Sequence, residues 1–285
     1  MCNKSKVKGD AFEYNILFKT FKSKNIQTVI NSLHPSFADI AKNLDVNSNT
    51  QWIIRTYLAS KMILASTVML TSAEYAESKN LRIVTPYLMY YPLLSCARAV
   101  VFTNPRYEWN EELVTMNHSK IISVVGDIVS RYDMEEGGRI KSFIEKSRIY
   151  REIFSYKFPA EGLKDMNLNF ERVVELCSLL AEIAQLQSAI LESAITKHCS
   201  EKYDVDEFEL RKLYSYDEKG FKFFDSEDRY RLDYIKRKVS RPYSIINTMT
   251  EGMVEDFFGS WCSDDENYED LYNPDQNWRI IFPVP

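Results

Sequence analysis

The sequence predicts a mainly α-helical protein built as a bundle, and three observations lead to this class. The 285 residues include only 8 glycines and 9 prolines, which argues for long helices and against a loop-rich β-sandwich. Apolar residues recur at three- and four-residue steps, most clearly along Asn169–Lys197. The stretch Ile83–Ala97 carries no charge over fifteen residues, so other segments have to enclose it. We therefore expect a helical bundle organised around residues 83–104.

The first part of the chain contains three expected elements. Phe12–Phe21 alternates partly but also fits a helix, so its conformation stays open. Asn25–Leu33 is typical of a short helix that ends before His34-Pro35, because proline disfavours a helical residue before it. A long helix is expected from Trp52 to Lys79, where apolar residues surround most of the circumference.

The central helix is expected over residues 83–104. Pro86 is tolerated in its first turn, Pro92 is expected to kink it, and Asn104-Pro105 ends it. After a polar loop, another helix is expected over His118–Tyr132.

Two further helices complete the expected bundle. The pair Gly137-Gly138 predicts a break, after which Arg139–Phe154 has a helical pattern. The helix over Asn169–Lys197 carries an apolar stripe on one side and polar residues on the other. These polar residues are Glu175, Ser178, Glu182, Gln185 and Glu192.

The last third of the chain differs in character. Lys212–Phe224 predicts a β-hairpin, because alternating Tyr and Phe residues flank the turn-like Asp217–Gly220. Helices are expected from Ser226 to Val239, by capping chemistry, and over Tyr243–Trp261. The expected parts are an N-terminal lead-in packing on the bundle, the bundle, and a C-terminal extension with an acidic tail. They span residues 1–50, 51–200 and 201–285.

Charge and cysteine usage narrow the class of protein. The net charge is −5, and removing the six acidic residues of 264–275 and Arg279 leaves 35 acidic and 35 basic residues. There is thus no chain-wide basic excess of the kind that indicates nucleic-acid binding. The five cysteines are widely spaced without a C-x-x-C pair, which favours free thiols in a reducing compartment. The apolar runs Met62–Ala73 and Ile83–Ala97 are too short to cross a bilayer, so we expect a cytoplasmic protein with no membrane span.

No sequence motif indicates a metal or a cofactor. Histidine and cysteine come close only at His198-Cys199, and adjacent side chains diverge on a helix. Gly137-Gly138 lacks the Lys-Ser/Thr of a phosphate loop, and there is no G-x-S-x-G elbow. We expect neither a metal site nor a cofactor.

The block TPYLMYYPLLSCARAVVF, followed by a loop and NHSKIISVVGDIV, resembles the HEPN superfamily of helical domains. Within this superfamily, the similarity is closest to the YaaC-like proteins and to HEPN proteins paired with minimal nucleotidyltransferases. The segment FKTFKSKNIQTVINSL resembles the aromatic-rich lead-in of the first group, and RIYREIFSY resembles the fourth helix of the second. The resemblance covers roughly residues 12–200. It matches a proline, a Tyr-Tyr pair, a small-residue segment around an arginine, and a histidine that opens the next helix. These residues are Pro86, Tyr90, Tyr91, Ala97, Arg98, Ala99 and His118.

The resemblance implies a helical bundle that commonly dimerises, often in bacterial conflict systems such as antiphage defence or toxin–antitoxin pairs. Many members are metal-independent ribonucleases with an arginine four to six residues before a histidine. That spacing sets a general base beside a cation able to stabilise the transition state. Here no arginine precedes His34, His118 or His198 at that interval, so the nuclease motif is absent.

A non-standard site could still form from residues on neighbouring helices. Arg98 and His118 could meet across the second and third helices, with Arg148 or Arg151 nearby from the fourth. The structural alternative pairs Arg98 with a carboxylate or carbonyl groups and uses His118 as a helix cap. We favour this alternative because buried arginines are usually paired.

A run of basic residues follows Ser226. It could bind nucleic acid or an acidic partner, with the acidic tail competing, although a solvated helix face is the favoured interpretation. The candidate binding residues are Arg229, Arg231, Lys236, Arg237, Lys238 and Arg241.

The leading functional hypothesis is a non-catalytic HEPN-like interaction or regulatory subunit of a bacterial defence or toxin–antitoxin system. We expect it to form a homodimer or a complex with a protein partner. One alternative is a metal-independent ribonuclease effector with a non-standard Arg/His site. The other is a nucleic-acid-binding adaptor, and both alternatives make RNA a ligand.

Overall fold

The computed structural model describes residues 12–162, 164, 168–199, 203–238 and 240–261. This part of the chain is mainly helical with one short antiparallel hairpin, so the predicted fold class is confirmed. Within the described residues before position 200 there are eight α-helices and one short 3-10 helix, Arg82–Val84. The α-helices are α1 (Asn15–Thr20), α2 (Ser23–Lys42), α3 (Val46–Ser78), α4 (Thr85–Thr103), α5 (Glu111–Val114), α6 (His118–Val129), α7 (Met134–Tyr156) and α8 (Phe170–His198).

The C-terminal extension adds short elements after α8. Its hairpin has the two-residue turn Lys219-Gly220, where both residues have positive φ, as a type I′ turn requires. The elements are α9 (Glu207–Tyr214), β1 (Ser215–Glu218), β2 (Phe221–Phe224), α10 (Ser226–Lys238), α11 (Ile245–Thr248) and α12 (Glu251–Gly259).

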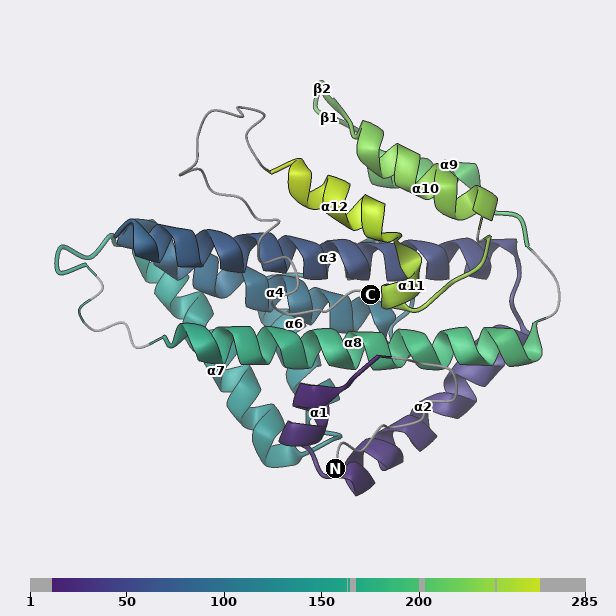
Figure 1. The fold of residues 1–285 in the computed structure, drawn as a ribbon, viewed down its shortest axis with the longest axis horizontal. Coiled ribbons are helices and arrows are strands. Elements are labelled where there is room, and N and C mark those ends of the chain that lie inside the picture. Colours follow the sequence, from purple (N-terminus) through teal and green to yellow (C-terminus); the bar gives the residue numbers. More distant parts are fainter. Residues whose placement is uncertain (1–11, 163, 165–167, 200–202, 239, 262–285) are drawn as a thin grey trace.

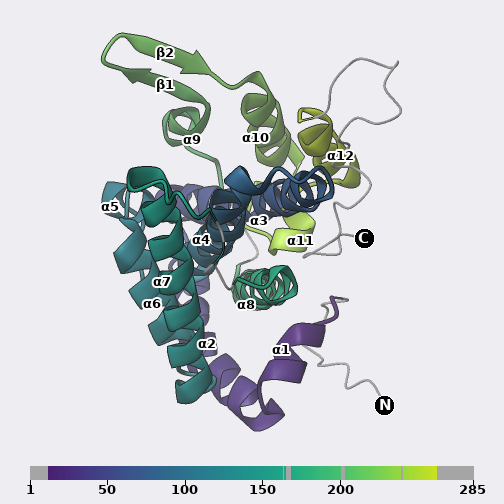
Figure 2. The same cartoon turned by 90° about the vertical axis from the view of Figure 1, so that its left-hand side faces the viewer.

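The long helices α3 and α8 run side by side across the molecule, with α4 packed against both (Figure 1). Helices α6 and α7 cover the other side of α4, and α2 packs on α8. In the second view, α9, α10 and α12 lie on the opposite side of α3 from the rest of the bundle (Figure 2). Helix α3 thus lies between the extension and the bundle.

Helix α3 contributes to two separate apolar clusters. Trp52, Ile63 and Leu70 belong to the main core with α4 and α8. Ile53 and Leu64 belong to a smaller cluster with α10 and α12. The all-round apolar pattern of this segment therefore reflects burial on two sides.

Two predicted helix boundaries, at Pro35 and at Gly137-Gly138, are wrong. Helix α2 continues through Pro35 to Lys42, where a stop was expected. Pro35 lies on the exposed side, where water can solvate the carbonyl that loses its partner, while buried Leu33 and Phe37 hold both sides of the helix in the core.

The pair Gly137-Gly138 is not a break, because α7 begins before it at Met134. The Asp133 side chain accepts a hydrogen bond from the Glu136 backbone N–H (3.0 Å) and caps the helix. A Cβ on Gly137 would lie 2.2 Å from Ser130 Oγ and 2.6 Å from Ser130 N. This glycine therefore allows the start of α7 to approach the end of α6 closely.

The remaining local predictions also have clear outcomes. Phe12–Phe21 contains α1, and the polar loop before His118 contains the single-turn α5. The predicted helix Tyr243–Trp261 is two helices, because Met249 is extended and Thr250 starts α12 by accepting a hydrogen bond from Met253 N–H. Pro92 lies inside α4, and the kink expected there stays a prediction.

Buried polar side chains of α8 hold two other segments in place. Glu182 accepts hydrogen bonds from the backbone N–H groups of Ile16 (3.0 Å) and Leu17 (2.6 Å) at the start of α1. On the same helix, Gln185 Oε1 and Ser188 Oγ each accept one from the start of α11, at Ile246 and Ile245 (3.0 Å each). These side chains satisfy N–H groups that have no partner within their own short helices.

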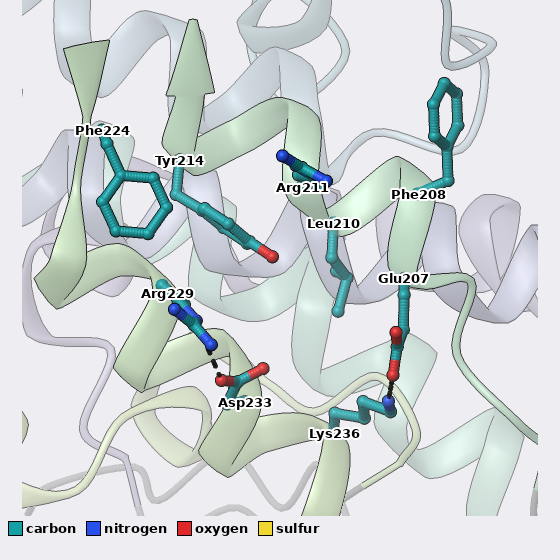
Figure 3. Close-up of a pocket in the computed structure, with 9 residues that line it drawn as sticks. All are labelled: Glu207, Phe208, Leu210, Arg211, Tyr214, Phe224, Arg229, Asp233 and Lys236. Atoms are coloured by element: carbon teal, nitrogen blue, oxygen red, sulfur yellow. Dashed lines mark hydrogen bonds and ion pairs between the residues drawn. The ribbon is translucent and has the colours of Figure 1, made fainter.

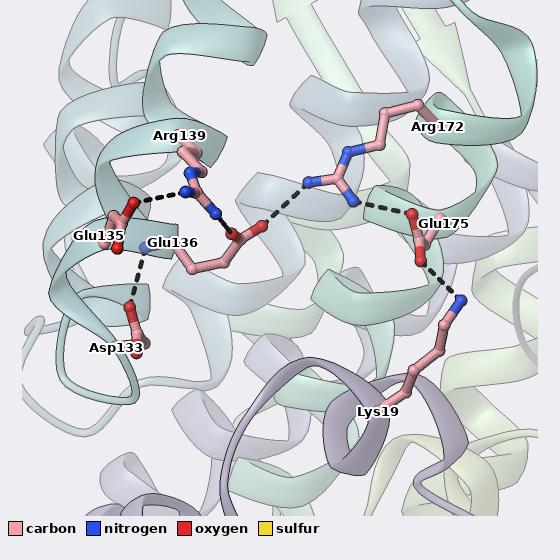
Figure 4. A network of polar contacts seen from close by, with 7 residues as sticks. All are labelled: Lys19, Asp133, Glu135, Glu136, Arg139, Arg172 and Glu175. Atoms are coloured by element: carbon pink, nitrogen blue, oxygen red, sulfur yellow. Dashed lines mark hydrogen bonds and ion pairs between the residues drawn. The ribbon is translucent and has the colours of Figure 1, made fainter.

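A surface network of charged residues links α1, α7 and α8 (Figure 4). Arg172 pairs with Glu136 (2.9 Å) and with Glu175 (2.7 Å), and Lys19 reaches Glu175 from α1 (3.0 Å). Arg139 also pairs with Glu136 (3.4 Å). The network joins elements far apart in sequence at the solvent boundary.

The extension rests on α3 through a buried charged cluster. The Tyr57 hydroxyl donates to Asp228 Oδ1 (2.6 Å), and the Lys61 ammonium pairs with Asp228 Oδ2. Burial and then the Asp228 charge raise the pKa of Tyr57, which keeps its hydroxyl a donor. Asp228 is the point at which α10 is attached to α3.

Helices α3 and α8 are long and apolar enough to cross a membrane by length and composition alone. Most of each apolar window is buried inside the protein, as in core helices of soluble folds. The cytoplasmic location expected from the sequence stays a prediction.

Candidate functional site

The structure brings Arg98, His118, Arg148 and Arg151 to one junction of α4, α6 and α7, which contact one another pairwise. Tyr90 and Tyr91 of α4 lie in the same cluster. We call these six residues the Arg/His/Tyr cluster. It forms because α6 and α7 pack against each other and both pack on α4, so residues from three helices meet.

His118 accepts hydrogen bonds through its Nδ1 atom. Nδ1 lies 2.9 Å from the Tyr90 hydroxyl and 3.3 Å from Arg151 Nη2. Arginine can only donate, so the contact with Arg151 makes Nδ1 the acceptor, and the Tyr90 hydroxyl, whose pKa burial raises to about 12, then donates to it as well. We therefore assign the proton of His118 to Nε2. Burial, followed by the charges of Arg151, Arg98 and Arg148, lowers the pKa of His118, so the neutral ring is favoured.

Arg151 has the greatest unused binding capacity in the cluster. Its guanidinium lies over Tyr90 (5.4 Å to the ring centroid) and Tyr91 (5.6 Å). Its Nε atom is buried without a hydrogen-bond partner, and it pairs with no carboxylate among the described residues. Arg148, by contrast, is neutralised by Glu145 (2.5 Å) and Glu152 (2.7 Å).

Arg98 serves the loop before α6. It donates to the backbone carbonyls of Val114 (2.9 Å) and Met116 (3.2 Å), and its guanidinium lies at the boundary with solvent. Pairing with carbonyl groups is one of the structural roles expected from the sequence. The expected cap is wrong, because Asn117, not His118, caps α6 by accepting from Lys120 N–H (2.9 Å).

Arg55 of α3 is a deeply buried arginine that was not predicted as such from the sequence. It donates to the carbonyls of Phe102 and Asn104 (2.6 Å each) at the C-terminal end of α4, and it stacks on Trp52 (3.8 Å to the ring centroid). Burial lowers its pKa to about 9. The partial negative charge of a helix C-terminus replaces a carboxylate as its partner. A tryptophan three residues earlier, on the same side of the helix, was the available signal.

The candidate binding residues of the extension do not form one basic face. Arg231 is buried beside Glu227 (3.6 Å), and Arg229 lies 3.7 Å from Asp233. Lys236 pairs with Glu207, and Arg237 donates to the Asp233 carbonyl (3.3 Å). Arg241 lies over Tyr243 (5.1 Å to the ring centroid), and Lys238 is exposed. The acidic run 264–275 lies outside the described residues.

A groove of about 750 Å³ lies between α9, α10 and the hairpin (Figure 3). Two of its charged pairs, Arg229–Asp233 and Lys236–Glu207, neutralise each other. The groove is lined by Glu207, Phe208, Leu210, Arg211, Tyr214, Phe224, Arg229, Asp233 and Lys236.

In the described residues, no group of three or more His, Cys, Asp or Glu side chains is arranged to hold a metal ion. No protein-family model matches this chain, and neither a curated protein nor a solved structure was found to match it. The resemblance to HEPN domains therefore rests on the sequence blocks quoted above.

Proposed function

We propose that this chain is a non-catalytic, HEPN-like interaction or regulatory subunit, of the kind that serves bacterial antiphage defence or toxin–antitoxin systems. The observation that carries the non-catalytic part is the state of His118. Its only lone-pair nitrogen, Nδ1, already faces the Tyr90 hydroxyl and Arg151. A base for RNA cleavage needs a free nitrogen to take the 2′-hydroxyl proton.

Two of the three arginines of the cluster are committed as well. Arg98 holds two loop carbonyls, and Arg148 is held by two glutamates. The lowered pKa of His118, due to burial and neighbouring arginines, also makes it a poor general acid, since little imidazolium is present near neutral pH. The cluster therefore supports the packing of α4, α6 and α7 better than it supports catalysis. The defence setting comes from the resemblance alone.

A ribonuclease effector is the second candidate, because one observation favours it. Arg151 has a buried Nε without a partner beside His118, and an unpaired guanidinium can bind a phosphate group. If RNA entered the cluster and displaced the Tyr90 hydroxyl, the lone pair of His118 would be released.

Incubation with RNA separates the two candidates. The purified chain would be mixed with tRNA and total RNA in EDTA, alongside His118→Ala, Arg151→Ala and Arg98→Ala variants. Arg139→Ala, an exposed arginine on α7 outside the cluster, is the matched control. We expect intact RNA with every protein. Cleavage by the unmodified chain that is lost in His118→Ala and Arg151→Ala but kept in Arg139→Ala would overturn the non-catalytic proposal.

A further inference from the structure

The hairpin of the extension exposes an unusual number of aromatic side chains. The exposed fractions are 49% for Tyr216, 70% for Phe221, 48% for Phe223 and 53% for Phe224. A two-stranded hairpin is marginally stable alone, and clustered exposed apolar residues indicate an interaction surface. The hairpin therefore has the composition of a strand pair that lacks its neighbour.

The backbone of β2 has hydrogen-bonding groups directed away from the hairpin. Asp225 N–H donates to the Tyr214 carbonyl (2.8 Å), which fixes the alternation of bonded and non-bonded pairs. In the observed register, Tyr216–Phe223 is then a bonded pair, whereas Lys222 and Phe224 direct their N–H and C=O groups outward. Figure 2 shows β1 on the side of α9 and β2 on the outer side.

Charge distinguishes the two edges. The β1 strand carries Asp217 and Glu218, so pairing it with a copy of itself would bring carboxylates together. The β2 strand has the sequence FKFF and no acidic residue. Only the β2 edge combines accessible backbone groups, apolar side chains and the absence of like-charge repulsion in an antiparallel pair.

We propose that β2 pairs antiparallel with β2 of a second copy of this chain, about a two-fold axis at Phe223, to form a four-stranded sheet. Lys222 of each copy then faces Phe224 of the other, and each such pair exchanges two N–H···O bonds. The two Phe223 rings meet on one face beside Tyr216 and Phe221, while the ammonium of Lys222 lies against the Phe224 ring on the other face.

Nucleic acid fits this surface less well than a second copy does. Single-stranded nucleic acid is held by aromatic stacking together with a positively charged groove. On the hairpin, Lys219 and Lys222 are balanced by Asp217 and Glu218, and Lys222 already lies 3.6 Å from Asp217. Pairing of two β2 strands through backbone hydrogen bonds does not require a net positive charge. The inference rests on the proposed role as an interaction subunit and names the partner as a second copy.

Sedimentation equilibrium of the full chain over a range of concentrations tests the proposal. Two four-residue strands bury little area, so we expect a weak dimer that dissociates on dilution. Phe223→Lys would place two ammonium groups on the axis, and Lys222→Pro would remove an outward N–H while leaving the bonds within the hairpin intact. Both variants should be monomeric. Phe208→Lys, which changes an aromatic residue of α9 that is more exposed than Phe223, should dimerise as the unmodified chain does.

A cross-link gives a positive signal. In the proposed pairing the two Phe223 residues form a non-bonded pair, whose Cα atoms lie about 4.5 Å apart, within the range of a disulfide. Phe223→Cys should therefore give a covalent dimer on oxidation with diamide, whereas Asp217→Cys on β1 should not. A monomer at every concentration would overturn the proposal, as would a dimer unaffected by Phe223→Lys and Lys222→Pro.

Binding of a single-stranded RNA oligonucleotide, measured by fluorescence anisotropy, would overturn the proposal if it required Phe223 while the protein stayed monomeric. The outcome is separable from the RNA cleavage test. If the protein is a monomer that leaves RNA intact, the strand-pairing proposal fails and the non-catalytic proposal stands. If it is a dimer that cleaves RNA, the non-catalytic proposal fails and the strand-pairing proposal stands.

Discussion

The bundle and the extension use buried polar groups in different ways. In the bundle, buried charged side chains bind backbone groups: Arg55 binds the carbonyls that end α4, and Glu182 binds the N–H groups that start α1. In the extension, Asp228 is attached to Lys61 and Tyr57 of α3, so side chains bind side chains. The contacts of Arg55 and Glu182 complete helices of the bundle, whereas those of Asp228 attach α10 to α3.

The bundle and the extension also differ in the size of their apolar clusters. The main core runs from α1 to α8 and includes Ile245 of α11, while α9, α10 and α12 share a smaller cluster with the outer side of α3. The hydrophobic effect is non-directional, and its contribution to stability scales with the apolar area buried. The larger main core therefore accounts for most of the stability. We infer that α9, α10 and α12 can open while the bundle and α11 stay folded.

The largest effect is expected from Arg55→Leu. This change leaves the carbonyls of Phe102 and Asn104 without partners in a buried site and removes the contact with Trp52. We expect a loss of about 4 kcal/mol in the free energy of unfolding, affecting the whole molecule. Urea denaturation followed by circular dichroism measures it.

Arg55→Lys is the matched variant for this prediction. A lysine keeps the charge but cannot bridge both carbonyls, so its loss should be smaller than that of Arg55→Leu. A change under about 1 kcal/mol for Arg55→Leu would show that water or other groups replace the guanidinium, and that the end of α4 does not depend on it.

A smaller and more local effect is expected from Asp228→Asn. It removes the charge that Lys61 and the Tyr57 hydroxyl share, at a cost of about 3 kcal/mol to the docking of the extension. Hydrogen exchange should become faster in α10 and remain unchanged in α4 and α8. Tyr57→Phe, which removes one neutral donor, should act in the same direction at about 1 kcal/mol. Equal acceleration throughout the molecule would mean that the two regions unfold together.

The elements with long periodic patterns could be predicted from the sequence. The stripe of α8 and the turn that closes the hairpin both follow from local rules, and both are observed. Pro35 and Gly137 were misinterpreted because their usual role as helix breakers was overridden by tertiary packing. Solvent around Pro35 and the contact of Gly137 with Ser130 are properties of the folded chain, not of the local sequence.

For the candidate site, the sequence indicated which side chains could come together but not which groups they would bind. The sequence raised the possibility that Arg98, His118 and Arg151 meet, since a family resemblance placed them on neighbouring helices, and the structure brings them together. The roles of Arg55 and Glu182 could not be predicted, because their partners are backbone groups. Backbone carbonyls and N–H groups are present at every residue, so no sequence pattern marks which ones a buried side chain will meet.

The contact between Glu182 and α1 predicts a dependence on pH. Burial raises the pKa of this carboxyl from 4.5 to about 7. The folded protein therefore binds an extra proton between those values, and the docking of α1 is strongest at low pH and weakens as pH rises through 7. Between pH 5.5 and 7.5 the loss should be about 2 kcal/mol.

Hydrogen exchange at Leu17 and Phe18, corrected for the intrinsic pH dependence of exchange, measures this effect. Glu182→Gln keeps an oxygen that accepts from α1 but cannot ionise, so its protection should be independent of pH. The same pH dependence in Glu182→Gln would assign the effect to another group.

The smallest effect is expected from the charged network at the surface of the bundle. Arg172→Gln breaks the pair with Glu136 that connects α7 to α8 and the pair with Glu175 within α8, but both partners remain partly accessible to water. Exposed pairs contribute little, so we expect a loss below about 1 kcal/mol that disappears in about 1 M salt. Thermal unfolding at low and high salt measures it, with Lys19→Gln as a variant of the neighbouring pair. A loss as large as that of Asp228→Asn, persisting in salt, would mean that charged contacts attach bundle helices as firmly as they attach the extension.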